Sequence, residues 1–530
     1  FMNLCHKEGL ICVKAHTNIL VWGKESEDQQ LRGKVSSALA GMNIICVQDT
    51  YSTPVLWASA FPGAAGELSA DNLMTRELKS FLCLGVNETF EQEMPAGTLK
   101  MCDRVRNIPL KIDLQAEAYK AGLIDNYNAF ILGGSGTGKS FFTNYFVRSC
   151  YDAGETVFII DVGDSYQGLC SVINEESSGA DGIYYTWDRN SPITFDAFIG
   201  ISEWVDGTGR LQQENDGLNF LLSFLQTLWS PAGGWNADSS NIIKQIVRDF
   251  ALSRRLTKER PIFDDLRSFI VTEIAPMIHS DEGYRCGDVN VTLSRFDIDG
   301  LVLAMGDYST GGPFGFLLND RNPRDLFSSR FTVFEVDKLS GINDSRFYSL
   351  CILCIMNSFN AKMRNTPGMK VMVIEEAWKA IANETMSGYL AGLWKTARKF
   401  QTSAVVVTQQ VSDIMSSQVV KDTILQNSSV RILLDQSNNR NSFSQLQELL
   451  GLTDHQRDVI LSMNRSRKKG LQYREVFIAL GDKKYGVYAT EVSPQEAICY
   501  ESNKEKKRPF LELSAKVGPI EAIRQLAGGE

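Results

Sequence analysis

Residues 133–140 carry the pattern with the clearest chemistry. They read Gly-Gly-Ser-Gly-Thr-Gly-Lys-Ser and fit G-x-x-x-x-G-K-[ST] without a mismatch. An apolar, strand-like run at 128–132 precedes them and a helical stretch follows, which is the context that such a loop requires. Glycines let the backbone fold tightly, so that its N–H groups and the helix N-terminus point at phosphate oxygens. We therefore expect a phosphate-binding loop formed by Gly133, Gly134, Ser135, Gly136, Thr137, Gly138, Lys139 and Ser140.

The last two residues of the loop have distinct expected roles. The Lys139 ammonium reaches the β- and γ-phosphates of a nucleotide, and the Ser140 hydroxyl is a magnesium ligand. ATP and Mg2+ are therefore the expected cofactors. A fortuitous glycine-rich turn is the alternative, and the match of both motif and context disfavours it.

Paired carboxylates end the apolar run at 370–374, which we expect to form a strand next to the P-loop strand. In P-loop ATPases the first acid of such a pair helps to hold magnesium, and the second polarises the attacking water. These roles fall to Glu375 and Glu376. Glu375 stands where Asp is usual and is one methylene longer, so a weak or inactive ATPase stays open. The alternative is that both are solvated carboxylates at a strand end without a catalytic role.

A second polar strand end follows the run at 403–407. We expect this strand to lie beside the P-loop strand, which would let Gln409 sense the γ-phosphate or orient water. The alternative is a strand that emerges into solvent.

Several cations are candidates for an arginine finger, a residue that completes the site across a subunit boundary. Arg398, followed by Lys399, is the first choice. The alternative is a solvated helix end whose cations complement the helix dipole. Arg431, Arg465 and Arg474 are rivals that the sequence does not separate.

Asp161 and Asp164 end the next strand-like run, at 156–161, where doubly wound sheets place ligands. Asp161 either supports the metal shell or caps a turn. Cys351 and Cys354 form a CxxC pair, which we interpret as two small residues on one face of a buried helix. A redox or zinc pair is the alternative, disfavoured because no second CxxC and no nearby His accompanies it.

The pattern of elements divides the chain into four parts. Residues 1–115 predict a partial α/β unit, with strand-like runs at 10–22 and 43–49 around a helical stretch at 28–42. Residues 116–196 and 301–500 alternate strands with helices, which predicts a mostly parallel sheet covered on both faces. Residues 197–300 show helical periodicity and predict a helical insertion. Residues 501–530 form a charged tail.

Composition restricts the class of protein. The 530 residues include 43% hydrophobic and 22% charged residues, which is ordinary for a globular protein. No apolar run is long enough for a transmembrane helix. Eleven scattered cysteines favour a reducing compartment. The net charge of −9 does not indicate DNA as the main partner, although it leaves room for a local basic patch. Arg465, Arg467, Lys468 and Lys469 form one such cluster, which we interpret as a solvated loop.

The order of these motifs resembles that of the TraG-type conjugation ATPases of conjugative transposons. The resemblance covers the chain from about residue 85 onward. It rests on the P-loop, on GGPFG at 311–315, on the EEAW strand end at 375–378, and on the ARK and TQQ motifs at 397–399 and 408–410. The P-loop alone would be generic, and the combination in this order is specific.

The resemblance implies further properties. It implies a RecA-like motor domain in an ATPase of the family that energises type IV secretion systems. It implies a homo-oligomer, often a hexamer, at the cytoplasmic face of the bacterial inner membrane, beside other inner-membrane components of the system. Lys139 and Ser140 match the family's nucleotide motif and Glu375 and Glu376 its acidic strand end. Arg398, Lys399 and Gln409 match its basic and glutamine motifs.

The function expected from these observations is an ATP-hydrolysing motor that drives pilus assembly and transfer of DNA or protein. A DNA-translocating coupling ATPase is one rival, which predicts transmembrane helices upstream and salt-sensitive DNA binding. A nucleotide-gated scaffold with little turnover is the other, and the extra methylene of Glu375 motivates it.

Overall fold

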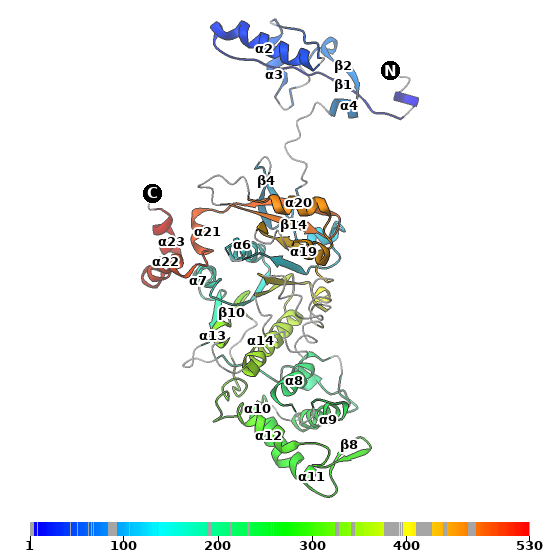
Figure 1. Ribbon diagram of the computed structural model, residues 1–530, viewed down its shortest axis with the longest axis vertical. Helices are drawn as coiled ribbons and strands as arrows, with labels where there is room; N and C mark the ends of the chain where they lie inside the picture. Colours follow the sequence, from blue (N-terminus) through cyan, green and yellow to red (C-terminus); the bar gives the residue numbers. More distant parts are fainter. Residues whose placement is uncertain are drawn as a thin grey trace. The chain divides into compact units, whose positions relative to one another are not determined.

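The computed structural model describes two units of the chain, Phe1–Phe90 and Glu91–Glu530. Figure 1 shows both, coloured along the sequence. The structure describes residues 5–528 apart from 8, 43, 50, 62, 65, 67, 83–92, 105–106, 135, 188–192, 213–214, 231–233, 256, 258, 324–327, 341–344, 376–391, 393, 395, 410–426, 438–442 and 465–472.

The first unit contains a two-stranded antiparallel sheet and several α-helices in its described part. Strand β1 (Cys12–Ala15) pairs with β2 (Met74–Glu77), and the helices include α2 (Asp28–Gly41), α3 (Thr53–Ser59) and α4 (Leu78–Leu82). The strand predicted at 43–49 is wrong, because residues 44–49 form none. Ile45 and Val47 are more than nine-tenths exposed there, so no packed surface stabilises an extended segment.

The second unit is built on an eleven-stranded sheet. Seven neighbouring strands are parallel, in the order β13 (Val430–Leu433), β5 (Ala129–Leu132), β12 (Thr402–Thr408), β11 (Lys370–Glu375), β6 (Thr156–Asp161), β10 (Phe331–Glu335) and β7 (Ile183–Thr186). An antiparallel extension continues beyond β13 with β14 (Arg474–Leu480), β15 (Lys484–Thr490), β3 (Leu99–Asp103) and β4 (Pro109–Ile112). The predicted mostly parallel sheet is confirmed.

The central strands are apolar along their length because helices cover both faces of the sheet. Every residue of β5 is buried. Phe130 and Leu132 belong to the core on one face, while Ala129 and Ile131 belong to the core on the other. Helices α6 (Lys139–Asp152) and α7 (Gln167–Glu176) contribute to the second core, and α14 (Ser345–Asn365) contributes to the first.

The strand order corrects one expectation about the site. Strand β12, which leads to Gln409, pairs directly with the P-loop strand β5, as predicted. Strand β11, which ends in Glu375, pairs with β12 and β6 and is not a neighbour of β5. All four strands are parallel, so their carboxyl ends still meet at one edge of the sheet.

The predicted helical insertion is mostly helical. It contains α8 (Asp216–Leu228), α9 (Ala237–Arg254), α10 (Phe263–Phe269), α11 (Ala275–His279) and α12 (Ile298–Gly306), with a π-helical segment at Ile270–Ile274. A short hairpin of β8 (Tyr284–Cys286) and β9 (Val289–Val291) interrupts them. Figure 1 shows these elements, in green, grouped at one end of the second unit. No described helix is both long and apolar enough to cross a membrane.

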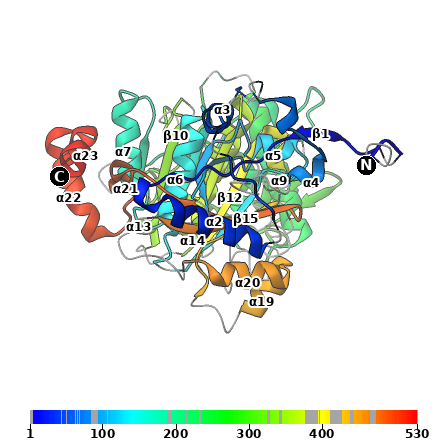
Figure 2. The same ribbon diagram turned by 90° about the horizontal axis from the view of Figure 1, so that it is seen from above.

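The C-terminal segment forms helices that pack against α7. These are α21 (Pro494–Cys499), α22 (Lys504–Val517) and α23 (Pro519–Ala527), which lie beside α7 in Figures 1 and 2. The Ile520 amide donates to Glu175 Oε2 at 2.8 Å. A Cβ atom on Gly168 would lie 2.7 Å from the Cys499 carbonyl oxygen, so the absence of a side chain on α7 permits this close approach.

Glu155 is a buried acid in the connection between α6 and β6. With its nitrogen turned toward the carboxylate, the Gln115 amide donates to Glu155 Oε1 at 2.7 Å. Burial, followed by the charge of Asp113, raises the pKa of Glu155 to about 7. The folded state therefore keeps this proton up to a higher pH than the unfolded chain does, and the stability from this group falls as pH rises from about 4.5 to 7.

We predict that Glu155→Gln stabilises the chain at pH 8 by up to about 3 kcal/mol, because the amide cannot ionise in this buried position. The gain shrinks as pH falls and disappears near pH 4.5. Denaturant unfolding at several pH values measures it, with the exposed Glu448→Gln as the control. An equal effect of Glu155→Gln at pH 5 and pH 8 would contradict the prediction.

Candidate nucleotide-binding site

The glycine-rich loop leaves the carboxyl end of β5 and is tied to the neighbouring strand. The Gly133 amide donates to the Thr408 carbonyl oxygen at 3.2 Å. Gly136 and Gly138 have φ angles of 75° and 93°, a region that side chains disfavour. The Thr137 hydroxyl donates to the Gly134 carbonyl oxygen at 2.7 Å and closes the turn. Ser135 lies outside the described residues.

Helix α6 begins at Lys139, directly after the loop. Lys139 is buried and Ser140 is half-buried. The spacing of the motif thus brings both residues into the first turn of a 14-residue helix, whose N-terminal N–H groups and dipole favour an anion. The roles of both residues in phosphate and magnesium binding stay predictions.

Three carboxylates lie at the carboxyl ends of adjacent strands. Asp161, Glu335 and Glu375 end β6, β10 and β11, and each is at most 2% exposed. Burial, with added repulsion from Glu375 and Glu335, raises the pKa of Asp161 well above its usual value. Glu335 accepts hydrogen bonds from the amides of Asp164, at 2.8 Å, and Asp337, at 2.6 Å. Three buried carboxyl groups are thus concentrated at the edge that bears the P-loop.

Asp161 and Asp164 have different environments. Asp161 Oδ2 accepts from the Tyr166 amide at 3.3 Å, which is the turn-capping role, and Oδ1 has no hydrogen-bond partner in the described part of the chain. Asp164 adopts a positive φ of 60°, and its carboxylate accepts from the Tyr184 hydroxyl at 2.8 Å. The buried Lys507 of α22 donates to the Asp164 carbonyl oxygen at 2.6 Å. The C-terminal helices therefore contact the turn that follows β6.

The turn after β6 is bonded to the P-loop helix, and sequence reasoning missed this. The side-chain amide of Asn144, in α6, donates to the carbonyl oxygens of Ser140, at 2.8 Å, and Ser165, at 3.1 Å. Ser165 Oγ lies 3.5 Å from Ser140 Oγ. The Tyr166 hydroxyl lies 2.6 Å from Glu375 Oε1. The available signal was the polar Asp-Ser-Tyr run at 164–166, which follows a buried strand after two intervening residues.

Of the predicted glutamine and the predicted general base, the structure describes only the glutamine. Gln409 directly follows β12 and is half-buried at the P-loop edge. Gln436, which we did not single out, is buried after β13 and donates to the Leu434 carbonyl oxygen at 3.1 Å. Glu376 lies outside the described residues.

The structure separates the rival arginines. Arg398 is exposed, directly before β12, and therefore lies at the amino end of the parallel strands, opposite the P-loop edge. There it donates to the Tyr119 hydroxyl. Arg474 lies against the P-loop of its own chain, because its Cγ would be 3.3 Å from a Cβ atom on Gly138. Arg431 pairs with Asp482 at 3.3 Å, and Arg465 lies outside the described residues.

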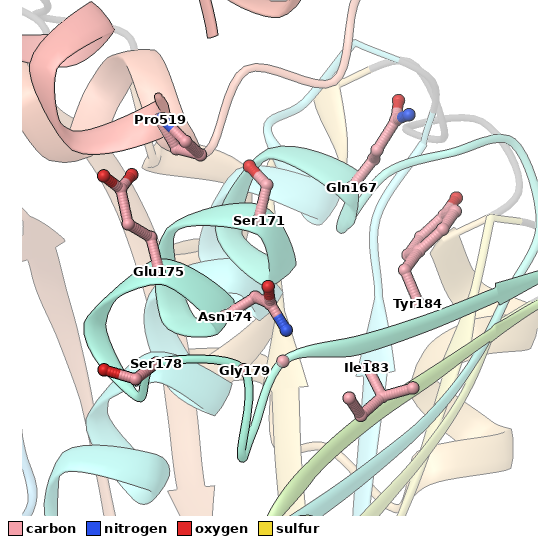
Figure 3. Close-up of a pocket in the computed structure, with 10 residues that line it drawn as sticks. Gln167, Ser171, Asn174, Glu175, Ser178, Gly179, Ile183, Tyr184 and Pro519 are labelled. Atoms are coloured by element: carbon pink, nitrogen blue, oxygen red, sulfur yellow. The ribbon is translucent and has the colours of Figure 1, made fainter. Parts of the chain in front are cut away.

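A large open pocket lies elsewhere. It has a volume of about 850 Å³ and is lined by α7, the edge strand β7 and Pro519 at the start of α23. Figure 3 shows Gln167 and Ser171 of α7 and Tyr184 of β7 around it. None of the described residues that line it is cationic.

The P-loop residues fit ATP and Mg2+. Gly136 and Gly138 adopt positive φ angles that residues with side chains disfavour, and Lys139 and Ser140 follow them at the start of α6. No group of three His, Cys, Asp or Glu side chains in the described residues is arranged to hold a metal ion. Magnesium commonly takes one or two protein ligands and completes its shell with phosphates and water, so Ser140 with a single acid is a suitable donor set. Asp161, whose carboxyl group interacts electrostatically with Glu375, offers a further buried acceptor in its Oδ1 atom.

The CxxC pair lies on α14. Cys351 and Cys354 are both buried and unbonded, as predicted for one face of a buried helix. Burial raises the pKa of both thiols.

We predict that Gly138→Ala weakens ATP binding more than Gly136→Ala does. Both substitutions add a side chain at positive φ, but only the Cβ atom at position 138 meets Arg474, whereas nothing lies within 4 Å of the one at position 136. Fluorescence titration with an ATP analogue and magnesium measures the affinities. Equal losses in the two variants would show that Arg474 does not restrict the loop.

Comparison with known proteins agrees with this geometry. A family model described as the TraG P-loop domain matches residues 98–530. TraC of Escherichia coli (strain K12) is 23% identical over 319 residues, which are 59% of this chain and 32% of TraC, so the match spans about a third of that relative. The structure of VirB4 of Thermoanaerobacter pseudethanolicus is similar with a TM-score of 0.53 at 17% identity, over 76% of this chain and 99% of that chain.

The plasmid coupling protein TrwB, in complex with ADP and Mg2+, has a TM-score of 0.42 at 13% identity, over 78% of this chain and 92% of that chain. The resemblance to TraG-type ATPases is thus confirmed by the family model, and the RecA-like fold by the likeness to VirB4. The chain belongs to the family of TraG P-loop domains found in conjugative type IV secretion.

Proposed function

We propose that this chain is an ATP-hydrolysing motor of a conjugative type IV secretion system, which drives pilus assembly and the transfer of DNA or protein. One observation carries the proposal. A P-loop with Lys139 and Ser140 in the first turn of α6 lies at the same sheet edge as the buried acid Glu375. A cation for phosphates beside an acid for a metal is the combination that phosphoryl transfer needs.

Each residue has a distinct role in the proposal. The loop amides and Lys139 bind and orient the phosphates of ATP, and Ser140 and Glu375 hold magnesium. When bound, magnesium neutralises charge that develops on the transferring phosphoryl group. Glu376 follows β11 directly and takes a proton from the attacking water as general base. Gln409, at the end of β12, orients that water.

The position of Arg398 favours a nucleotide site that is shared between two subunits. Because it lies at the opposite edge of the sheet from the P-loop of its own chain, it reaches a nucleotide only in another subunit. This is the arrangement of a homo-oligomer, for which we propose a hexameric ring. We further propose that the ring works at the cytoplasmic face of the bacterial inner membrane with other components of the secretion system. Arg474, by contrast, would contact nucleotide in its own chain.

One observation favours a second candidate, a nucleotide-gated scaffold with little turnover. Glu375 replaces the usual Asp, and Tyr166 engages its Oε1 atom at 2.6 Å. A carboxylate held in this way would bind nucleotide and metal without supporting rapid hydrolysis.

We predict that Lys139→Ala and Glu376→Gln abolish magnesium-dependent ATP hydrolysis. Loss of a general base lowers the rate by about 10²–10⁴-fold. Steady-state turnover over a range of protein concentrations is the measurement, with the exposed Lys120→Ala as the control. Turnover that rises with concentration and survives only in the control supports the motor. Tight ATP binding without turnover in the unmodified chain would contradict it and favour the scaffold.

A mixing experiment separates the two arginines. Arg398→Ala subunits retain their P-loop and Lys139→Ala subunits retain their arginine, so a randomly mixed ring has intact sites at about a quarter of its interfaces. We predict that this mixture recovers activity that neither variant has alone. A mixture of Arg474→Ala with Lys139→Ala recovers none, because Arg474 acts in its own chain. The opposite pattern would identify Arg474 as the residue that acts across the interface.

A further inference from the structure

Tyr166 is a fully buried tyrosine whose hydroxyl contacts Glu375 at the end of β11. The hydroxyl lies 2.6 Å from Glu375 Oε1 and 2.8 Å from Thr143 Oγ1. Thr143 Oγ1 itself lies 3.3 Å from Glu375 Oε1 and donates to the Ser140 carbonyl oxygen at 3.1 Å. Tyr166, Thr143 and Glu375 are all buried, so one polar cluster joins β11 to the first turns of the P-loop helix.

The backbone around Tyr166 is fixed from two sides. Its amide donates to Asp161 Oδ2 at 3.3 Å, which anchors it to the end of β6. Asn144 joins the adjacent Ser165 to Ser140 through their carbonyl oxygens. The backbone of Tyr166 is therefore held in place, so the contact depends on the conformation of the Glu375 side chain.

This fixed donor matters because of the length of the acidic side chain. Glu375 has one more rotatable bond than the Asp that is usual at this position, so its carboxylate can occupy more places at the strand end. A hydrogen bond to an ionised carboxylate is short and strong, and burial makes its loss costly. A phenol held by the turn after β6 can select one carboxylate position among those that the longer side chain permits.

We propose that Tyr166 is a positioning residue that holds Glu375 at the magnesium site and compensates for the extra methylene of this acid. The proposal rests on the proposed function only in that the P-loop binds ATP with magnesium. It does not require rapid turnover. Tyr166 touches neither phosphate nor metal and acts through Glu375.

A purely structural role for Tyr166 makes different predictions. Its ring belongs to the core beneath α6 and α7, and a buried hydroxyl needs a partner in any case. If Glu375 only satisfies that hydroxyl, then Glu375→Asp restores the usual family residue and leaves metal binding unchanged or improved. If Tyr166 positions Glu375, then Glu375→Asp withdraws the carboxylate from the hydroxyl and weakens metal binding.

The experiment measures ATP-analogue binding by the full chain as a function of magnesium concentration, with manganese bound to the complex followed by electron paramagnetic resonance. Tyr166→Phe removes only the hydroxyl. Tyr184→Phe is the matched control, because its hydroxyl contacts Asp164 of the same turn, at 2.8 Å, and not Glu375. Glu375→Asp and the double variant complete a cycle.

We expect Tyr166→Phe and Glu375→Asp each to raise the magnesium concentration for half-maximal binding about tenfold, with metal-free affinity changed by no more than about twofold. The double variant should be no worse than either single one, because both remove the same contact. The control should resemble the unmodified chain. Unchanged magnesium dependence in Tyr166→Phe, additive losses, or improved binding in Glu375→Asp would each overturn the proposal.

Three further outcomes can also be interpreted. If Tyr166→Phe does not fold, the sign of the effect of Glu375→Asp still distinguishes the two roles. An unmodified chain that binds ATP with magnesium but does not turn it over contradicts the motor and leaves the tyrosine test intact. An unmodified chain that binds no nucleotide in a magnesium-dependent way overturns both proposals.

Discussion

Burial of three carboxyl groups at the carboxyl edge of the parallel sheet is the constraint on which the site depends. Asp161, Glu335 and Glu375 end three adjacent strands and are almost fully excluded from water. An ionised carboxylate in such a place is strongly destabilising unless hydrogen bonds or a cation compensate for it. Backbone amides donate to Glu335 and the Tyr166 hydroxyl contacts Glu375, whereas one Asp161 oxygen has no hydrogen-bond partner among the described residues.

The neighbouring elements bring positive charge toward these buried acids. The P-loop helix begins beside the acidic edge, so its N-terminus and Lys139 bring positive potential to the same region. The turn after β6 is bonded both to that helix and to Glu375, and Lys507 reaches it from α22. A magnesium–nucleotide complex would add positive charge beside these acids and an anion at the loop. The C-terminal helices are connected to this region through the same turn.

Much of the second unit could be predicted from the sequence because its signals are local. The P-loop spacing placed Lys139 and Ser140 correctly at the start of a helix, and the apolar runs identified the central strands. The position of β11 could not be predicted, because strand order depends on which crossover each helix makes and not on the strand itself. Strand propensity was also misleading at 44–49, where the described residues offer no surface against which to pack.

The supporting residues of the site were hidden for a related reason. Tyr166, Asn144 and Gln436 matter through partners that are distant along the chain, and no motif marks such pairs. The arginines show the same limit, since the sequence favoured Arg398 without excluding Arg474, and only the fold places them at different edges of the sheet. Residues that contact substrate follow spacing rules, whereas residues that hold them in place follow the fold.

The most direct test of the central claim is an experimental structure of the chain with magnesium and a non-hydrolysable ATP analogue. We predict phosphates against the 133–140 loop, Lys139 within hydrogen-bond distance of them, Ser140 and Glu375 at the metal, and Tyr166 still bonded to Glu375. Nucleotide bound elsewhere, for example in the pocket between α7 and β7, or a metal remote from Glu375, would contradict the account.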